Sequence, residues 1–214
     1  MKFDERFLDK YGMVLPNPRH EDKPCDNGVL FTSVAVVLGF DIPDFREKIR
    51  SCYLKRGLVA RWQKNDFDQA AWDDYLGIAV ACLYLNETKI PREILWYGIR
   101  HAFFFDTDRN LEGKDFLGRH ITVWPLMLCA AFPWASFWMF WVQGFVQLFF
   151  KDPLKLLMEN NSSGFQLQWL FYRGCLKSGN FFDGCRDHER VLQEGLKMYY
   201  HAEHPFNTKF FNRG

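Results

Sequence analysis

The stretch ITVWPLMLCAAFPWASFWMFWVQGFVQLFF, residues 121–150, contains no charged side chain. Charged or titratable residues bound it on both sides, with Arg119 and His120 before it and Lys151 after it. Its Trp and Phe rings must be covered by lipid, by other helices of the chain or by a partner protein, because so large an apolar surface is unstable in water. The fold class therefore depends on what covers this stretch.

Two prolines divide the stretch and weaken the case for a membrane span. A spanning helix needs about 20 successive apolar residues, and Pro133 leaves only residues 134–150, which include Gln143 and Gln147. These two glutamines lie four residues apart on one helical face, which is typical of a helix packed on most sides with one polar edge. The pattern favours a protein core or an assembly interface over membrane insertion. The candidate interface residues are Trp134, Trp138, Trp141 and Phe145.

The rest of the chain has helical patterns joined by short turns. In the first half, helices are expected at residues 2–11, 28–40, 43–55, 67–85 and 91–105. No convincing alternation of apolar and polar residues indicates a strand. We therefore predict an all-α fold of about nine helices in antiparallel αα-hairpins. No linker is long enough to separate two units, so residues 1–214 are predicted to form a single helical domain.

Composition excludes several classes of function. The 27 Lys and Arg residues nearly balance the 26 Asp and Glu residues, and no basic cluster is present, so a nucleic-acid surface is not expected. The six cysteines include no C-x-x-C pair, and no glycine-rich phosphate loop occurs, so no cofactor is expected. The N-terminal segment is charged and does not resemble a signal peptide, which indicates synthesis in a cytoplasm.

The adjacent carboxylates Asp73 and Asp74, with Arg61 upstream, are the first candidate for chemistry. Side chains of adjacent helical residues point about 100° apart, so only one of the two can face a given pocket. That one could serve as a general acid or base if it is buried beside a partner. The simpler interpretation is that a first helical turn accepts acidic residues because of the helix dipole, and we favour it.

A second candidate is the loop DTDRNLEGKD, in which Asp106 and Asp108 begin like a calcium-binding loop. The sixth position of such a loop is normally Gly and the twelfth Glu, but here they are Leu111 and Leu117. An EF-hand is therefore excluded. A looser cation site formed by Asp106, Asp108 and Asp115 remains an alternative to a solvated loop, which we favour.

Five short segments together resemble a family of small proteins encoded by tailed bacteriophages. They are DNGVLFTSVAVVLG, GLVARW, WDDYLGIAV, LGRH and the final YYHAEHPFNTKFF. Members of that family are generally virion-associated or of undefined role. The resemblance implies a structural component of a virion that is made in the host cytoplasm and docks to other virion proteins or to copies of itself.

A second resemblance is to the (α/α) toroids of glycosidases and polysaccharide lyases, which carry an early Asp-Asn-Gly segment and a later Trp-Asp-Asp helix start. This resemblance implies that Asp26, Asn27, Arg61, Asp73 and Asp74 line the mouth of a barrel. About nine helices fall short of a full toroid, so a partial toroid is the corresponding fold.

Three functional hypotheses follow from the sequence. We favour a non-enzymatic virion component. The first alternative is a carbohydrate-active toroid enzyme acting on host-surface glycans, and the second is a membrane-associated phage protein that inserts through residues 121–150.

Overall fold

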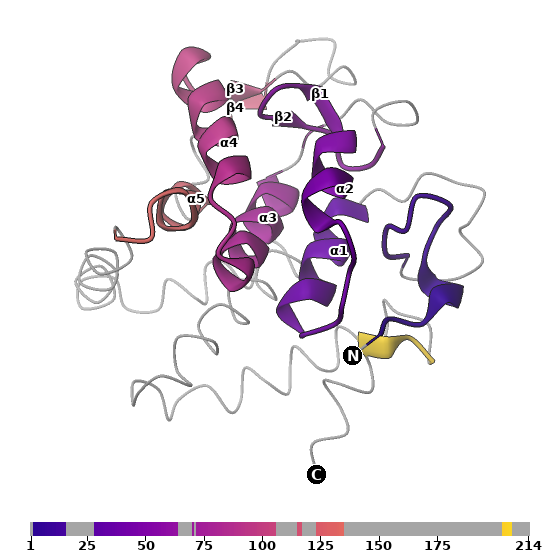
Figure 1. Cartoon of the computed structure of the whole chain (residues 1–214). Helices are drawn as coiled ribbons and strands as arrows, with labels where there is room; N and C mark the ends of the chain where they lie inside the picture. The colour runs from indigo at the N-terminus through magenta and orange to yellow at the C-terminus, as the bar shows by residue number, and fades with distance from the viewer. Residues whose placement is uncertain are drawn as a thin grey trace, which may run out of the picture.

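The structure is a computed structural model that describes residues 2–15, 28–63, 70, 72–105, 115–116, 123–134 and 203–206. These ranges contain five α-helices, one 3-10 turn and two small antiparallel sheets of two strands each (Figure 1). The helical elements are η1 (Glu5–Phe7), α1 (Gly28–Val37), α2 (Phe45–Ser51), α3 (Trp72–Leu85), α4 (Lys89–Arg100) and α5 (Val123–Ala131). The paired strands are β1 (Tyr53–Lys55) with β2 (Leu58–Val59), and β3 (Phe104–Phe105) with β4 (Asp115–Phe116).

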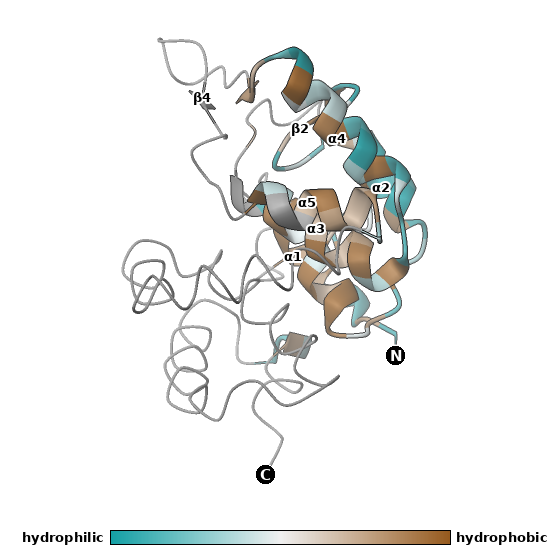
Figure 2. Ribbon diagram, turned by 90° about the vertical axis from the view of Figure 1, so that its left-hand side faces the viewer, coloured by the Kyte–Doolittle hydropathy of each residue, from teal (hydrophilic) through white to brown (hydrophobic). Residues whose placement is uncertain are grey.

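Helix α3 is the centre of the packing, since it contacts α1, α4 and α5. Every residue of α1 is buried, which explains why its sequence is apolar on all sides. Figure 2 shows the contrast between α1, which is mostly hydrophobic, and α4, on which hydrophilic and hydrophobic residues alternate. Helix α4 therefore contributes one face to the core and presents another to solvent.

The N-terminal segment forms a turn, and the helix predicted at residues 2–11 is wrong. Only η1 is helical there. The carboxylate of Asp9 accepts hydrogen bonds from the backbone N–H groups of Tyr11 (2.9 Å) and Met13 (2.7 Å), and Gly12 takes a φ of 71°. Such bonds from an Asp side chain to the following backbone compete with a helix and turn the chain back on itself.

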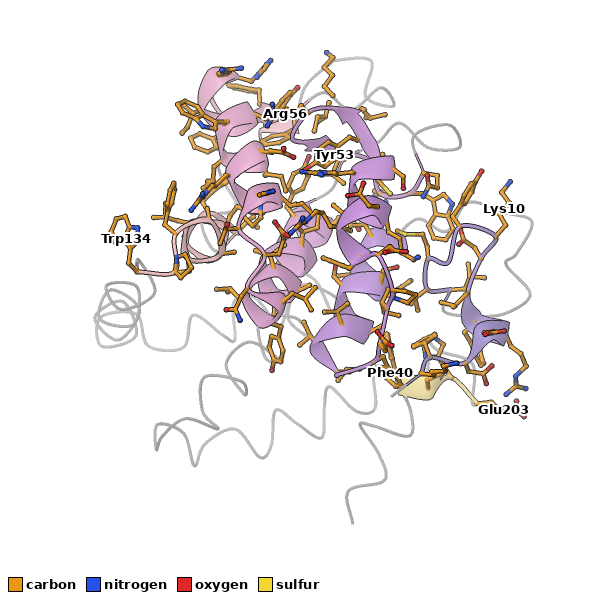
Figure 3. The ribbon with its side chains drawn as sticks, in the orientation of Figure 1. Lys10, Phe40, Tyr53, Arg56, Trp134 and Glu203 are labelled. Atoms are coloured by element: carbon orange, nitrogen blue, oxygen red, sulfur yellow. The ribbon has the colours of Figure 1, made fainter. Side chains whose placement is uncertain are left out.

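Residues 203–206 lie against this N-terminal segment, so two distant parts of the chain meet (Figure 1). His204 is fully buried, and its Nδ1 accepts a hydrogen bond from the N–H of Phe206 at 3.2 Å. Nε2 therefore carries the ring proton and donates it to the backbone oxygen of Leu15 at 2.8 Å. The ring also packs edge-on against Phe7, with centroids 4.8 Å apart. Figure 3 shows Phe40 beside the same segment.

The helix predicted at residues 43–55 is wrong after Ser51. Helix α2 ends at Ser51, and the chain then forms the β1–β2 hairpin. Gly57 reverses the chain with a φ of 87°, a conformation that side chains rarely adopt. A Cβ at this position would also lie 2.2 Å from the backbone oxygen of Glu93 on α4. The hairpin therefore depends on a close approach to another helix.

The helix predicted at residues 91–105 is also too long. Helix α4 ends at Arg100, and Ala102 and Phe103 take left-handed φ values of 51° and 61°. This turn places the Phe103 ring against Trp124, with centroids 4.6 Å apart, and starts strand β3. The predicted all-α fold of about nine helices, with its partial-toroid variant, is therefore wrong for the part of the chain that the structure describes.

Helix α5 is the described part of the long uncharged stretch. It starts at Val123 and ends at Ala131, so Pro125 lies in its first turn and Pro133 follows its end. The helix predicted at residues 134–150 lies outside the described residues, except for Trp134 at its start. Within the described ranges, no helix is both long enough and apolar enough to cross a bilayer. One domain over residues 1–214 stays a prediction.

Candidate functional site

The structure brings together two of the residues that the sequence singled out, Arg61 and Asp74. Asp74 lies in the first turn of α3 and is fully buried. Its Oδ1 accepts a hydrogen bond from the backbone N–H of Leu30, at the start of α1, at 3.0 Å. Arg61 follows β2, and its Nε lies 3.8 Å from Asp74 Oδ2. The backbone oxygen of Arg61 accepts the N–H of Val29 at 3.1 Å.

This arrangement fixes α1 to α3 and to the end of β2. The first N–H groups of a helix have no partner within it. A carboxylate at this end accepts a hydrogen bond from one of them, and its negative charge interacts favourably with the helix dipole. The 3.8 Å separation between Arg61 and Asp74 is an ionic contact rather than a hydrogen bond. The geometry therefore assigns Asp74 a role in holding two helices together.

Two aromatic residues support the cluster. The hydroxyl of Tyr75 accepts the N–H of Val59 at 2.9 Å, and burial raises the pKa of Tyr75 well above its usual value, so it stays neutral. The ring of Trp62 covers the first residue of α1, and a Cβ added to Gly28 would lie 1.7 Å from Trp62 Cε3. Glycine is therefore needed at residue 28 for this packing.

The other predicted site residues are only partly placed. Asp73 lies in α3 and Asp115 in β4, but their side chains are not among those described. In the described part of the chain, no cluster of His, Cys, Asp or Glu side chains is suited to hold a metal ion. The predictions for Asp26, Asn27, Asp106, Asp108, Trp138, Trp141 and Phe145 lie outside the described residues.

Sequence reasoning missed a cluster around Glu93, on the side of α4 that faces α2 and β1. Glu93 Oε1 lies 3.0 Å from the guanidinium of Arg56 and 3.5 Å from that of Arg50, and its Oε2 accepts the hydroxyl of Tyr53 at 3.0 Å. Burial and the neighbouring Glu93 charge raise the pKa of Tyr53. Figure 3 shows Tyr53 and Arg56 in this region. No local motif signals the cluster, because its members come from α2, β1, the following turn and α4.

A second carboxylate, Glu87, joins α2 to the start of α4. It pairs with Arg46 and accepts the backbone N–H of Lys89 at 2.7 Å. Burial alone acts to raise the pKa of Glu87, but these bonds outweigh it and lower that pKa below its ordinary value. A shallow pocket of about 370 Å³ opens beside this pair, with Ile42, Phe45 and Leu85 among its lining residues.

The solvent-facing side of α4 lies beside Glu93 and opposite the buried Ile94 and Gly98, and it carries an exposed set of aromatic and cationic residues. We call it the α4 outer face, and it consists of Lys89, Arg92, Trp96, Ile99 and Arg100. Trp96 is 60% exposed and Ile99 is 58% exposed. The spacing of three to four residues places all five on one side of the helix. The same spacing is visible in the sequence, but the sequence does not show that this side of the helix faces solvent. That depends on which side α3 and α5 cover.

Trp134, one of the four predicted interface residues, is the most exposed of the large hydrophobic residues that the structure describes, at 72%. It follows α5 and projects away from that helix in Figure 3. Its ring centroid lies 6.1 Å from that of Phe132, over which the guanidinium of Arg92 is placed. Trp134 and the α4 outer face are therefore linked through Phe132.

Comparisons of this chain with protein-family models, with curated proteins and with solved structures find no match.

Proposed function

We propose that the protein is a structural component of a tailed-bacteriophage virion and that it acts by docking to other particle proteins. The observation that carries this proposal is the exposure of Trp96 and Trp134, at 60% and 72%, beside the exposed Ile99. Trp and Arg dominate the binding energy of protein interfaces, and both are present on this side of the molecule. The assignment to a phage particle rests on the resemblance of five segments to tailed-phage proteins.

The free energy of association that Trp96 and Trp134 can contribute is consistent with a docking role. A Trp side chain buries 150–250 Å² in a core or interface. At about 25 cal/mol per Å², covering the exposed parts of two such rings contributes on the order of 5 kcal/mol to association. That contribution matches a few hot-spot residues in a specific interface.

The catalytic alternative draws no support from the described geometry. Asp74 is fully buried and bonds to the start of α1 at 3.0 Å, so this carboxylate stabilises the fold. We therefore do not propose glycan hydrolysis through Asp74.

Mass spectrometry of purified particles tests the proposal. We expect the protein at a fixed number of copies per particle after density-gradient purification, whereas an abundant host cytosolic protein should disappear. Absence of the protein from such particles contradicts the proposal.

A variant then tests the surface. Trp96→Ala should reduce incorporation into particles without changing the urea midpoint of the purified protein, because Trp96 is exposed. The matched control is Tyr84→Ala, since Tyr84 is 48% exposed and belongs to α3 rather than to the α4 outer face. Equal incorporation of the two variants contradicts docking through this side.

A further inference from the structure

The arginines of the described part divide into two groups. Most of them contact a carboxylate: Arg6 with Asp4 and Glu203, Arg46 with Glu87, Arg50 with Glu47 and Glu93, Arg56 with Glu93, and Arg61 with Asp74. Arg92 and Arg100 do not form an ion pair with any described residue, and both lie on the α4 outer face. Lys89, on the same face, likewise lacks a carboxylate among the described side chains.

Arg92 and Arg100 are nevertheless held in place. The guanidinium of Arg92 lies 5.1 Å from the ring centroid of Phe132, and its Nε donates to the backbone oxygen of Ala131 at 2.9 Å. The guanidinium of Arg100 lies 5.6 Å from the ring centroid of Trp96. A guanidinium stacked on a ring keeps N–H groups at its edge available for a carboxylate. Both cations are therefore oriented before any partner binds.

The spacing of the two arginines defines what can bind. They are eight residues apart on α4, which corresponds to about 12 Å along the helix axis. Trp96 and Ile99 lie between them and are exposed. The face therefore offers an apolar patch between two oriented cations, with Lys89 one turn beyond Arg92.

We propose that the α4 outer face binds an acidic segment of a partner protein. Two carboxylates of that segment, separated by about 12 Å along the α4 axis, pair with Arg92 and Arg100, and an apolar side chain between them packs on Trp96 and Ile99. A helix with acidic residues seven or eight positions apart has this spacing. The inference rests on the proposed function only in assigning the partner to the virion.

A protein segment fits this face better than an anionic bilayer does. Attraction to anionic lipid grows by about 1 kcal/mol for each basic residue near the surface, and this face has only Lys89 besides the two arginines. Carboxylate pairing by a guanidinium is directional, because two N–H groups bind two oxygens. The fixed spacing therefore selects for a partner whose charges are also fixed.

A peptide assay tests the charge requirement independently of the particle. The probe is a synthetic helical peptide with two Glu residues seven positions apart and Leu between them, and its control has Gln in place of both Glu. We expect the full-length protein to bind the Glu peptide at least tenfold more tightly than the Gln peptide, as measured by Trp fluorescence. Arg100→Gln should remove most of this difference, whereas Arg6→Gln, a remote arginine that has carboxylate partners, should leave it unchanged.

Equal binding of the two peptides, or equal loss in both variants, overturns the inference. Arg92→Gln should behave like Arg100→Gln, but it also removes the bond to Ala131, so circular dichroism and a urea midpoint must accompany it. A third arm measures binding to vesicles of phosphatidylglycerol and phosphatidylcholine. Arg100-dependent vesicle binding without a preference for the Glu peptide contradicts the inference in favour of a lipid surface.

A cross-linking experiment identifies the natural occupant. A photoreactive phenylalanine analogue at residue 99 is activated in purified particles, and the linked peptide is sequenced. A linked segment from another protein with acidic residues at the stated spacing supports the inference, and exchanging those acids for Arg should restore incorporation of an Arg92→Glu, Arg100→Glu double variant. A cross-link to this chain's own residues, to lipid or to a segment without acids overturns it. In that case presence of the protein in the particle still supports the proposed function, so the two failures are distinguishable.

Discussion

Replacing Asp74 by Ala tests the structural role of the buried carboxylate. The substitution removes the acceptor of the Leu30 N–H, which lies 3.0 Å from Asp74 Oδ1 at the start of α1. It also removes the negative charge that faces Arg61. Both α1 and α3 lose the group that holds them together, so the effect should appear in global stability.

The magnitude follows from these two contacts. Leaving a buried N–H without its acceptor costs about 1–3 kcal/mol, and removing a favourable charge from a helix N-terminus costs about 0.3–1 kcal/mol more. The Arg61 side chain is 25% exposed, so water compensates part of its lost contact. We therefore expect Asp74→Ala to lower the free energy of unfolding by about 1–4 kcal/mol. Asp74→Asn keeps one acceptor oxygen and should lose about half as much.

Urea unfolding followed by circular dichroism measures this loss. The matched control is Glu47→Gln, which removes an exposed carboxylate that lies 3.5 Å from Arg50 on the surface, and it should change the free energy of unfolding by less than about 0.5 kcal/mol. An Asp74→Ala protein as stable as the control refutes the assignment. Such a result would mean that Asp74 does not stabilise the fold, and Asp74 would again be a candidate functional residue.

Three further predictions concern other parts of the structure. Gly28→Ala should lower the urea midpoint because its Cβ would lie 1.7 Å from Trp62 Cε3, and Trp62→Leu should restore part of the loss by making room. The lowered pKa of Glu87 means that its stabilisation is present above the unfolded-state pKa of about 4.3 and is lost as pH falls through the folded value. Glu87→Gln should therefore flatten the fall in urea midpoint on acidification, whereas an unchanged pH profile contradicts the ionic role of Glu87. His204→Ala should speed proteolytic cleavage near the N-terminus, because it removes the bond to Leu15 O, while Glu203→Gln, which weakens the exposed ion pair with Arg6, should not.

The sequence identified the buried helices well and the short strands badly. The apolar residues of α1 and the prolines around α5 are local signals, so the positions of both helices could be predicted. The β1–β2 hairpin could not, because Gly57 adopts its turn in contact with the backbone of Glu93, far along the chain. Residues 53–55 directly follow a helix in the sequence and show no strand pattern, so tertiary packing determines their conformation.

The candidate site shows the same division. Arg61 and Asp74 were singled out from their local motifs, and the structure does place them 3.8 Å apart. Their structural role depends on the Leu30 N–H, which no local pattern could reveal. The α4 outer face was missed for a similar reason, since helical spacing alone does not say which side a neighbouring helix covers.

The contact between His204 and Leu15 has a consequence for the order of folding. Its two partners are 189 residues apart in the chain, and closing a loop of this length carries an entropic cost that rises by about 0.6 kcal/mol with each doubling of length. During translation, the N-terminal segment emerges from the ribosome long before residue 204 is synthesised. Phe3 and Phe7 therefore lack the packing of the His204 ring during most of synthesis. A chaperone that recognises exposed aromatic residues can bind the N-terminal segment during this time.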